Sequence, residues 1–234
     1  MFKKEKILAI IPARGGSKGL KDKNIINLAG KPLIAWTIEV AQNSKYIDEI
    51  FVSTDSEKIQ KTVENFGLRI PFLRPEHLST DNSKSIDVIF HVLDYYSQTS
   101  ILFQHFILLQ PTSPLRTVED IDNAIELYFQ KKAEAVVSVR QVSQPPYLMN
   151  TIADDLNMKD FINKKVSNSI RQEMPDYYWI NGAIYLANVN FYRENKSLYG
   201  DKTFAYIMPK ERSVDIDEKI DLLLAEQLLK LKKA

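Results

Sequence analysis

Short runs of consecutive apolar residues alternate, over the first 140 positions, with longer segments in which apolar residues recur every three or four positions. An unbroken apolar run of four to eight residues is typical of a strand covered on both faces of a sheet, whereas the longer period is typical of an amphipathic helix. The sequence therefore predicts alternating strands and helices. The expected strands are residues 7–11, 49–54, 105–110 and 133–139, and the expected helices begin at Pro32, after Ser56, at Ser85 and after Thr117.

Strands and helices that alternate at this spacing indicate an α/β fold with a doubly wound, mostly parallel sheet. In such a sheet ligands bind beyond the carboxyl ends of the strands. Three polar stretches follow predicted strands and are expected to meet at that edge. They are residues 13–19 (ARGGSKG), 53–57 (STDSE) and 110–116 (QPTSPLR).

The regular alternation stops after Val139. Residues from about 140 to 180 are polar, contain prolines and have weak periodicity, so they predict an inserted lid or dimerisation arm. A strand at 181–188, a short strand at 205–208 and a terminal helix over 217–233 follow. The length of 234 residues suits one α/β domain with such an appendage.

Composition excludes several classes of function. The chain has no cysteine, so it has no disulfide, zinc–thiolate site or cysteine nucleophile. Its net charge of +1 gives no indication of nucleic acid or a membrane surface as a partner. The apolar run near the start ends at Arg14 without a small-residue cleavage site, so we expect a buried first strand rather than a signal peptide.

The glycine-rich stretch after the first predicted strand, IPARGGSKGLKDKN (11–24), has the composition of an anion-binding loop. Glycines allow backbone N–H groups to approach phosphate oxygens, and Arg14, Lys18 and Lys23 supply positive charge. The spacing matches neither a Walker A loop nor G-x-G-x-x-G. A solvated turn is the alternative. The glycines concerned are Gly15, Gly16 and Gly19.

The stretch VDID (214–217) places two carboxylates two residues apart. If the backbone is extended, Asp215 and Asp217 face the same side and can share one Mg²⁺ with substrate phosphates. The alternative is that Asp217 caps the terminal helix that begins near Glu218. Both interpretations remain open from the residues alone.

Two further stretches carry polar groups beside predicted strands. In LLQPTSPLR the side chain of Gln110 offers neutral hydrogen bonds that suit hydroxyls or a base, although the same stretch also fits a turn into a helix capped by Thr117 with Asp120 as capping-box partner. In RQEMPDYYWINGAIY, Arg171 can pair bidentately with a carboxylate. Asn181-Gly182 permits a tight backbone before the next strand.

Taken together, these stretches resemble the CMP-sialic acid synthetases (N-acylneuraminate cytidylyltransferases). IPARGGSKGLKDKN is similar to that family's signature loop, and VSTDS, LRPEHLSTD, LLQPTSPLR, RQxxP…NGAIY and SVDID follow in the family's order. The resemblance covers nearly the whole chain. The sister synthetases for 3-deoxy-manno-octulosonate have a different loop and resemble the chain less.

The resemblance implies one nucleotidyltransferase-type domain over residues 1–234, with the 140–180 segment as an arm that forms a homodimer. It implies a cytoplasmic enzyme that joins CTP to a nine-carbon 2-keto sugar acid, first of all N-acetylneuraminate, with Mg²⁺. Legionaminate or another nonulosonate is the alternative acceptor, and a non-catalytic nucleotide-binding regulator is the alternative of another class.

The residues that match the family's motifs fall into three groups. Those expected to bind CTP are Arg14, Gly15, Gly16, Ser17, Lys18, Lys23, Asn24, Arg74 and Ser85. Those expected near the sugar are Gln110, Arg171, Asn181 and Tyr185. Those expected to hold the metal are Asp215 and Asp217, and the residues expected to act in catalysis are Arg14, Lys18, Lys23 and Asp217.

The chain departs from the family's pattern on the sugar side. Trp179 stands where some members have a second arginine, and Leu198 and Tyr199 stand where some members have two phenylalanines. These differences leave cytidylyl transfer intact and leave the identity of the sugar open.

Overall fold

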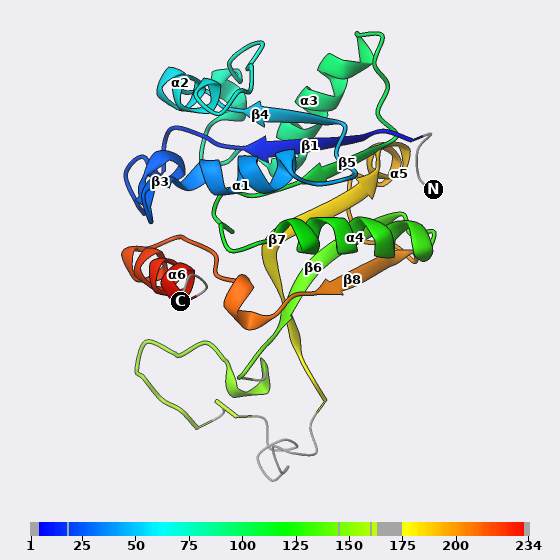
Figure 1. Ribbon diagram of the computed structural model, residues 1–234. Helices are drawn as coiled ribbons and strands as arrows, with labels where there is room; N and C mark the ends of the chain where they lie inside the picture. The colour runs from blue at the N-terminus through cyan, green and yellow to red at the C-terminus, as the bar shows by residue number, and fades with distance from the viewer. Residues whose placement is uncertain (1–4, 18, 145, 160, 163–174, 232–234) are drawn as a thin grey trace.

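A six-stranded sheet in the order β4-β1-β5-β7-β6-β8 forms the centre of the molecule (Figure 1). The computed structural model describes residues 5–17, 19–144, 146–159, 161–162 and 175–231. β1 pairs in parallel with β4 and β5, and β6 pairs in parallel with β8, whereas β7 runs antiparallel to β5 and β6. The predicted α/β class and mostly parallel sheet are confirmed. The strands are β1 (Ile7–Pro12), β4 (Glu49–Ser53), β5 (His105–Leu108), β6 (Ala135–Gln141), β7 (Tyr178–Asn188) and β8 (Thr203–Ile207).

Helices cover both faces of the sheet, as a doubly wound fold requires. α1, α2 and α4 pack on one face, and α3 and α5 pack on the other. α6 packs at the carboxyl edge against a small hairpin formed by β2 (Asn27–Leu28) and β3 (Lys31–Pro32), which the sequence pattern did not predict. The helices are α1 (Leu33–Gln42), α2 (Glu57–Glu64), α3 (Ser85–Ser97), α4 (Val118–Gln130), α5 (Val189–Asn195) and α6 (Lys219–Leu231). The short 3₁₀ helices are η1 (Lys23–Ile25), η2 (Glu76–Leu78), η3 (Pro146–Leu148) and η5 (Lys210–Arg212).

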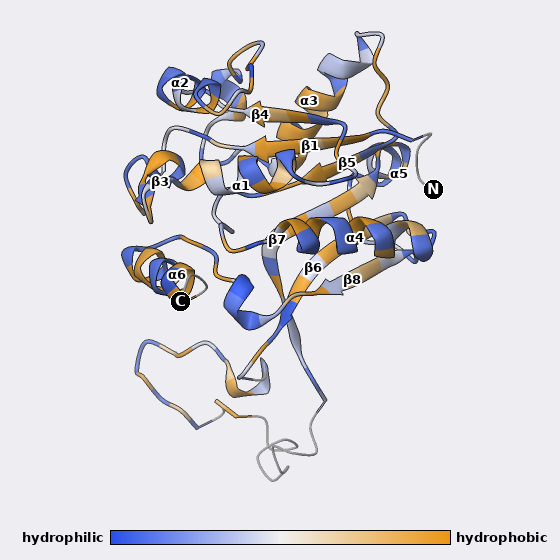
Figure 2. Ribbon diagram, in the orientation of Figure 1, coloured by the Kyte–Doolittle hydropathy of each residue, from blue (hydrophilic) through white to orange (hydrophobic). Residues whose placement is uncertain are grey.

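The first strand shows why its sequence is an unbroken apolar run. Ile7, Ala9 and Ile11 contribute to the core beneath α1, α2 and α4, whereas Leu8 and Ile10 contribute to the core beneath α3 and α5. Because both faces are covered, no position of the strand between residues 7 and 11 is exposed. Figure 2 shows the same arrangement, with hydrophobic strands at the centre and polar helix surfaces outside.

Two predicted helix starts are confirmed by their caps. The Ser56 hydroxyl accepts the N–H of Ile59 at 3.4 Å at the start of α2. At the start of α4, the Thr117 hydroxyl accepts the N–H of Asp120, and the Asp120 carboxylate accepts the N–H of Thr117, which completes a capping box. Each cap satisfies N–H groups that have no partner inside the helix.

β6 and β7 continue beyond the sheet as a two-stranded ribbon. Arg140 lies opposite Trp179 and Gln141 lies opposite Tyr178, and the described residues between the two strands stand outside the sheet (Figure 1). This inserted segment falls within the predicted 140–180 range. Its role as a dimerisation arm stays a prediction. Across the part of the chain described here, none of the helices has the length and apolar character needed to cross a membrane.

Candidate active site

A cavity of about 530 Å³ opens at the carboxyl edge of the sheet. Two of the three polar stretches predicted to meet there, residues 13–19 and 110–116, line it directly. The third, residues 53–57, does not line it but contacts residues beside it, because Ser53 accepts from Arg74 and Asp55 accepts from Gly15. The predicted site residues that line this cavity are Arg14, Ser17, Lys23, Asn24, Arg74, Ser85, Gln110 and Asp217. Gly19 also lines it, whereas Lys18 and Arg171 lie outside the described residues.

Internal hydrogen bonds fix the glycine-rich loop beside the cavity. The Gly15 N–H donates to Asp55 Oδ1 at 2.8 Å, so this N–H is already engaged. The amide of the buried Asn24 donates to the Arg14 carbonyl at 2.9 Å. Asn24, predicted as a direct CTP contact, therefore also holds the loop in place, and Asp55 does so from the end of β4.

Two cations at the cavity are paired with acidic side chains. Arg14 lies 2.9 Å from Asp81, and Lys23 Nζ lies 2.8 Å from Asp217 Oδ1. Ion pairs as exposed as these contribute only about 0–1 kcal/mol. A triphosphate entering the cavity can therefore replace either carboxylate at little cost. Asp81 was not identified from the sequence, although the LRPEHLSTD motif contains it.

Arg74 differs from these two cations because it is buried. Its guanidinium donates to the hydroxyl and the carbonyl of Ser53 at 3.0 and 2.5 Å. Burial lowers the pKa of Arg74, the charge of Asp55 opposes this effect, and the charge of Arg14 adds to it. Within the described ranges no carboxylate forms an ion pair with Arg74. Its positive charge is thus available to an anion in the cavity.

The two aspartates of VDID are positioned by the residue between them. Ile216 is fully buried, and its N–H donates to the Thr112 carbonyl at 2.8 Å. Asp215 Oδ1 is buried, and no hydrogen-bond partner for it occurs in the described part of the chain. Burial raises the pKa of Asp215, a hydrogen bond from Thr112 opposes that effect, and the charge of Asp217 adds to it.

Asp217 does not cap the terminal helix in the predicted way. The N–H groups of Asp217 and Glu218 donate to Asp221 Oδ2 at 3.0 and 2.8 Å, while the Asp217 carboxylate accepts from Lys23. Asp221, which the sequence did not single out, performs this part of the capping. The carboxylate of Asp217 thus remains at the cavity.

The aspartate pair fits a Mg²⁺ ion. Mg²⁺ prefers carboxylate oxygens, takes one or two of them, and completes its shell with water and substrate phosphates. The unpartnered buried oxygen of Asp215 is a ligand atom of this type. Among the described residues no group of three or more His, Cys, Asp or Glu side chains gathers as a metal site, so substrate oxygens would complete the coordination.

A second cavity has a volume of about 230 Å³. Asp215 lines the second cavity and Asp217 lines the first. Asn181, Arg140 and Trp179 also line the second cavity. One short segment, residues 215–217, therefore contributes a carboxylate to a larger cavity with several cations and another to a smaller cavity.

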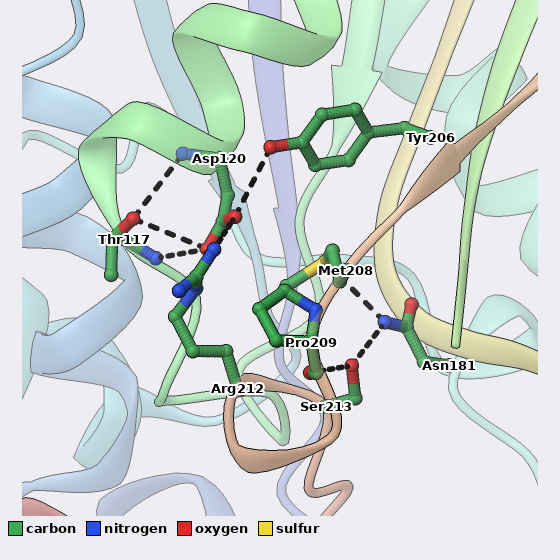
Figure 3. A network of polar contacts seen from close by, with 8 residues as sticks. All are labelled: Thr117, Asp120, Asn181, Tyr206, Met208, Pro209, Arg212 and Ser213. Atoms are coloured by element: carbon green, nitrogen blue, oxygen red, sulfur yellow. Dashed lines mark hydrogen bonds and ion pairs between the residues drawn. The ribbon is translucent and has the colours of Figure 1, made fainter. Parts of the chain in front are cut away.

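Asn181 is predicted to contact the sugar, but the structure engages its amide in internal contacts (Figure 3). The Oδ1 accepts from Ser138 Oγ at 2.6 Å, and the Nδ2 donates to Ser213 Oγ at 2.9 Å and lies 3.3 Å from Met208 Sδ. Ser213 stands two residues before Asp215. Asn181 thus fixes the segment that carries the first aspartate.

Of the two other residues predicted near the sugar, Gln110 lines the larger cavity, whereas Tyr185 lines neither of the two cavities. An ideal Cβ on Gly182 would approach Gln110 Oε1 to 2.5 Å and Asp215 Oδ2 to 3.7 Å. Tyr185 is half-buried in β7, and burial raises its pKa to about 12, so its hydroxyl stays protonated at neutral pH. The backbone of Gly182, with φ of 76°, therefore lies directly against both Gln110 and Asp215.

Gly182→Ala should lower the free energy of unfolding more than Gly67→Ala. Both glycines have positive φ, so both variants incur the strain of a side chain in the left-handed region, on the order of 1–2 kcal/mol. A Cβ added to Gly67 would have no atom within 4 Å, whereas alanine at 182 must displace the flexible end of the Gln110 side chain, which adds up to about 1 kcal/mol. Urea denaturation of both variants measures the difference, and equal losses would contradict the close contact.

Comparison with known proteins identifies relatives over the whole described fold. The model of the cytidylyltransferase family matches residues 8–233. An N-acylneuraminate cytidylyltransferase of Escherichia coli is 41% identical over 94% of this chain, but the match covers only 51% of that protein, so the chain spans about half the length of this relative. A CMP-N,N'-diacetyllegionaminic acid synthase of Legionella pneumophila is 39% identical over 97% of both chains.

A solved structure shows the same fold at low sequence identity. The CMP:2-keto-3-deoxy-manno-octonic acid synthetase complexed with CTP superposes with a TM-score of 0.73, at 16% identity, over 97% of this chain and 100% of that chain. This likeness concerns the arrangement of the elements alone.

Proposed function

Because the chain belongs to the cytidylyltransferase family, we propose that it transfers CMP from CTP to the anomeric hydroxyl of a nine-carbon 2-keto sugar acid. The observation that carries the proposal is that neighbouring aspartates line two cavities, Asp217 the larger and Asp215 the smaller. The larger, cationic cavity suits a nucleoside triphosphate, and the smaller suits an acceptor. The reacting atoms would meet at the aspartates between them.

We propose that the residues of the larger cavity neutralise the charge of the CTP triphosphate and position it. Arg14 and Lys23 contact triphosphate oxygens after releasing Asp81 and Asp217, and Arg74 supplies a fixed buried charge. Phosphoryl-type transfer depends mainly on such positioning and on stabilising the charge that develops on the leaving group. We assign Lys18 the same kind of role from the sequence motif.

The proposed reaction forms one bond and breaks one. The C2 hydroxyl oxygen of the sugar acid attacks the α-phosphorus of CTP, the bond from that phosphorus to the β-phosphate oxygen breaks, and pyrophosphate leaves. Mg²⁺ held by Asp215 and Asp217 would supply Lewis-acid stabilisation of phosphate charge. The hydroxyl proton passes to solvent or to Asp217, which we propose as the base if one acts.

Gly19→Ala should lower kcat/KM about 10-fold, because small displacements of positioning groups reduce rates on that scale or more. A Cβ at this position would lie 2.6 Å from the Asp217 carbonyl oxygen, so the loop or the aspartate segment must move. The matched control is Gly16→Ala in the same loop, where no atom lies within 4 Å of the new Cβ. Steady-state kinetics with CTP compares the two, and similar losses would contradict the packing of Gly19 on Asp217.

The test of the proposed function is pyrophosphate release with CTP, Mg²⁺ and a panel of sugar acids. The panel contains N-acetylneuraminate, diacetyllegionaminate, pseudaminate and 3-deoxy-manno-octulosonate, with EDTA, UTP and ATP as controls. We expect CTP-dependent release with a nonulosonate, abolished by EDTA. Binding of CTP without release in any arm would instead support a nucleotide-binding regulator.

N-acetylneuraminate is the first acceptor we propose, and diacetyllegionaminate is the second candidate. The second is favoured by one observation, that the Legionella relative matches this chain over 97% of both lengths. The ratio of kcat/KM for the two acids decides between them.

We also propose that the enzyme is a cytoplasmic homodimer joined through the inserted segment. Its described residues carry exposed apolar side chains that a second copy would cover, namely Leu148, Met149, Ile152, Leu156 and Met158. Light scattering coupled to size exclusion should give twice the chain mass. Replacing Leu156 and Met158 by Ser should shift that mass toward the monomer, whereas an unchanged mass would assign the contact elsewhere.

A further inference from the structure

We propose that Arg140, assisted by Lys210, binds the C1 carboxylate of the acceptor in the second cavity and so selects sugar acids over neutral sugars. The inference rests on the proposed function and names residues that the sequence motifs did not. Both side chains line the cavity of about 230 Å³ that also contains Asp215.

Arg140 has an unused charge at this position. Its guanidinium lies 4.7 Å from the centroid of the Trp179 ring, across the β6–β7 ribbon. Its Nε is buried without a hydrogen-bond partner, and no ion pair of Arg140 occurs among the described residues. Stacking on an aromatic ring orients the guanidinium plane while its N–H edge stays available for a planar anion. Because Nε is buried, a carboxylate in the cavity would pair bidentately with the two terminal Nη groups.

The ribbon that carries Arg140 is fixed relative to Asp215. Ser138, two residues before Arg140, donates to Asn181 Oδ1, and Asn181 donates in turn to Ser213. Lys210, at the start of η5, donates to Ser143 Oγ at 3.0 Å and brings a second positive charge to the cavity. The cations and the aspartate thus belong to one connected framework.

An acidic acceptor can enter the second cavity only if cations compensate the negative charges already there. Asp215 and Asp221 line the same cavity and would repel a carboxylate approaching through it. In a 2-keto sugar acid the C1 carboxylate is bonded to C2, the carbon that bears the attacking hydroxyl. When that hydroxyl is near Asp215, the carboxylate must therefore lie close by, within reach of Arg140 and Lys210.

The same cations could instead contact a phosphate of CTP, and kinetics separate the two sources of negative charge. Arg140→Gln should raise the KM for the sugar acid about 10- to 100-fold, the scale of a charge-assisted hydrogen bond, and leave the KM for CTP unchanged. Wild-type enzyme should prefer the acid to its C1 amide, and Arg140→Gln should lose that preference. Arg193→Gln, which removes a surface arginine paired with Asp94, is the matched control.

Each outcome decides the inference. A rise in the KM for CTP, or an unchanged preference for the acid over the amide, would overturn it while the proposed function stands. If Arg140→Gln does not fold, Arg140→Lys, which keeps the charge but loses the planar fork, must still raise the KM for the sugar acid selectively. No turnover of any sugar acid by the wild type would overturn the proposed function, and this inference with it.

Discussion

Asp217→Asn is expected to lower the turnover number at least about 100-fold, the scale on which loss of one strong electrostatic stabiliser acts. The carboxylate lines the larger cavity and holds Lys23 Nζ at 2.8 Å. Asparagine has nearly the same size but lacks the charge that pairs with Lys23 and that we propose binds Mg²⁺. The side chain is 70% exposed, so the free energy of unfolding should change by less than about 1 kcal/mol. The lost activity would then reflect chemistry rather than unfolding.

The matched control for this variant is Glu218→Gln. Glu218 is the next residue, is exposed and lines the same cavity, so the substitution removes a neighbouring charge without touching the aspartate pair. Single-turnover rates and a Mg²⁺ titration should be measured for both variants. Near-normal turnover of Asp217→Asn with unchanged Mg²⁺ dependence would show that Asp217 does not hold the metal.

Asp120→Asn is expected to lower the free energy of unfolding by about 3 kcal/mol, the low end of the range for breaking a buried ion pair. The Asp120 side chain is fully buried, and both its oxygens accept from Arg212 at 2.9 Å (Figure 3). It also accepts from Thr117 and Tyr206, so one carboxylate joins the start of α4 to β8 and η5. In the variant the Arg212 guanidinium faces a neutral amide and loses its ion pair, which destabilises the folded state. Urea denaturation at neutral pH measures the loss.

The control for Asp120 is an ion pair of the same chemistry on the surface. Asp94 lies 2.7 Å from Arg193, with 55% and 37% of the side chains exposed. Asp94→Asn should therefore change the free energy of unfolding by no more than about 1 kcal/mol. Equal effects of the two variants would show that burial of Asp120 does not determine the strength of its pair.

The same carboxylate predicts a pH dependence of stability. Burial opposes ionisation of Asp120 and is the largest single effect, but the hydrogen bonds and charge of Arg212, together with Thr117, outweigh it and hold its pKa below 3.8. A group whose pKa is lower in the folded state stabilises the fold above its unfolded pKa. This contribution is lost as the pH falls from about 4 through the lower, folded pKa, and Asp120→Asn should flatten that part of the stability curve.

The sequence predicted the alternating elements well because both faces of the sheet are covered. An unbroken run such as residues 7–11 fits a strand buried on both faces better than any other element, and the Thr117–Asp120 pair marks a helix start through local chemistry alone. The direction of β7 was not predictable in the same way. An antiparallel strand buried on both faces has the same apolar run as a parallel one. A short connection would have indicated an antiparallel neighbour, but the long segment before β7 is compatible with either direction.

The residues of the candidate site were predictable where the signal is local in the sequence and were missed where it depends on folding. Arg14, Lys23 and Asp217 were predicted because charge and glycine cluster locally, and they line one cavity. Asp55 and Asp221 were missed because their contacts are with backbone N–H groups brought close only by folding. Arg140 was missed because its position depends on the ladder partner Trp179, which lies far later in the chain.

The β6–β7 pair has a neighbouring strand on both sides at its base and on neither side at its tip. At the base, β5 and β8 flank it, whereas Arg140 and Trp179 pair only with each other. We therefore expect substitutions at the tip to change the proposed acceptor pocket without disturbing the strand register that supports the larger cavity. If the proposed roles of the two cavities hold, a lineage can exchange one acceptor for another by mutating this end of the ribbon, and CTP binding is inherited unchanged.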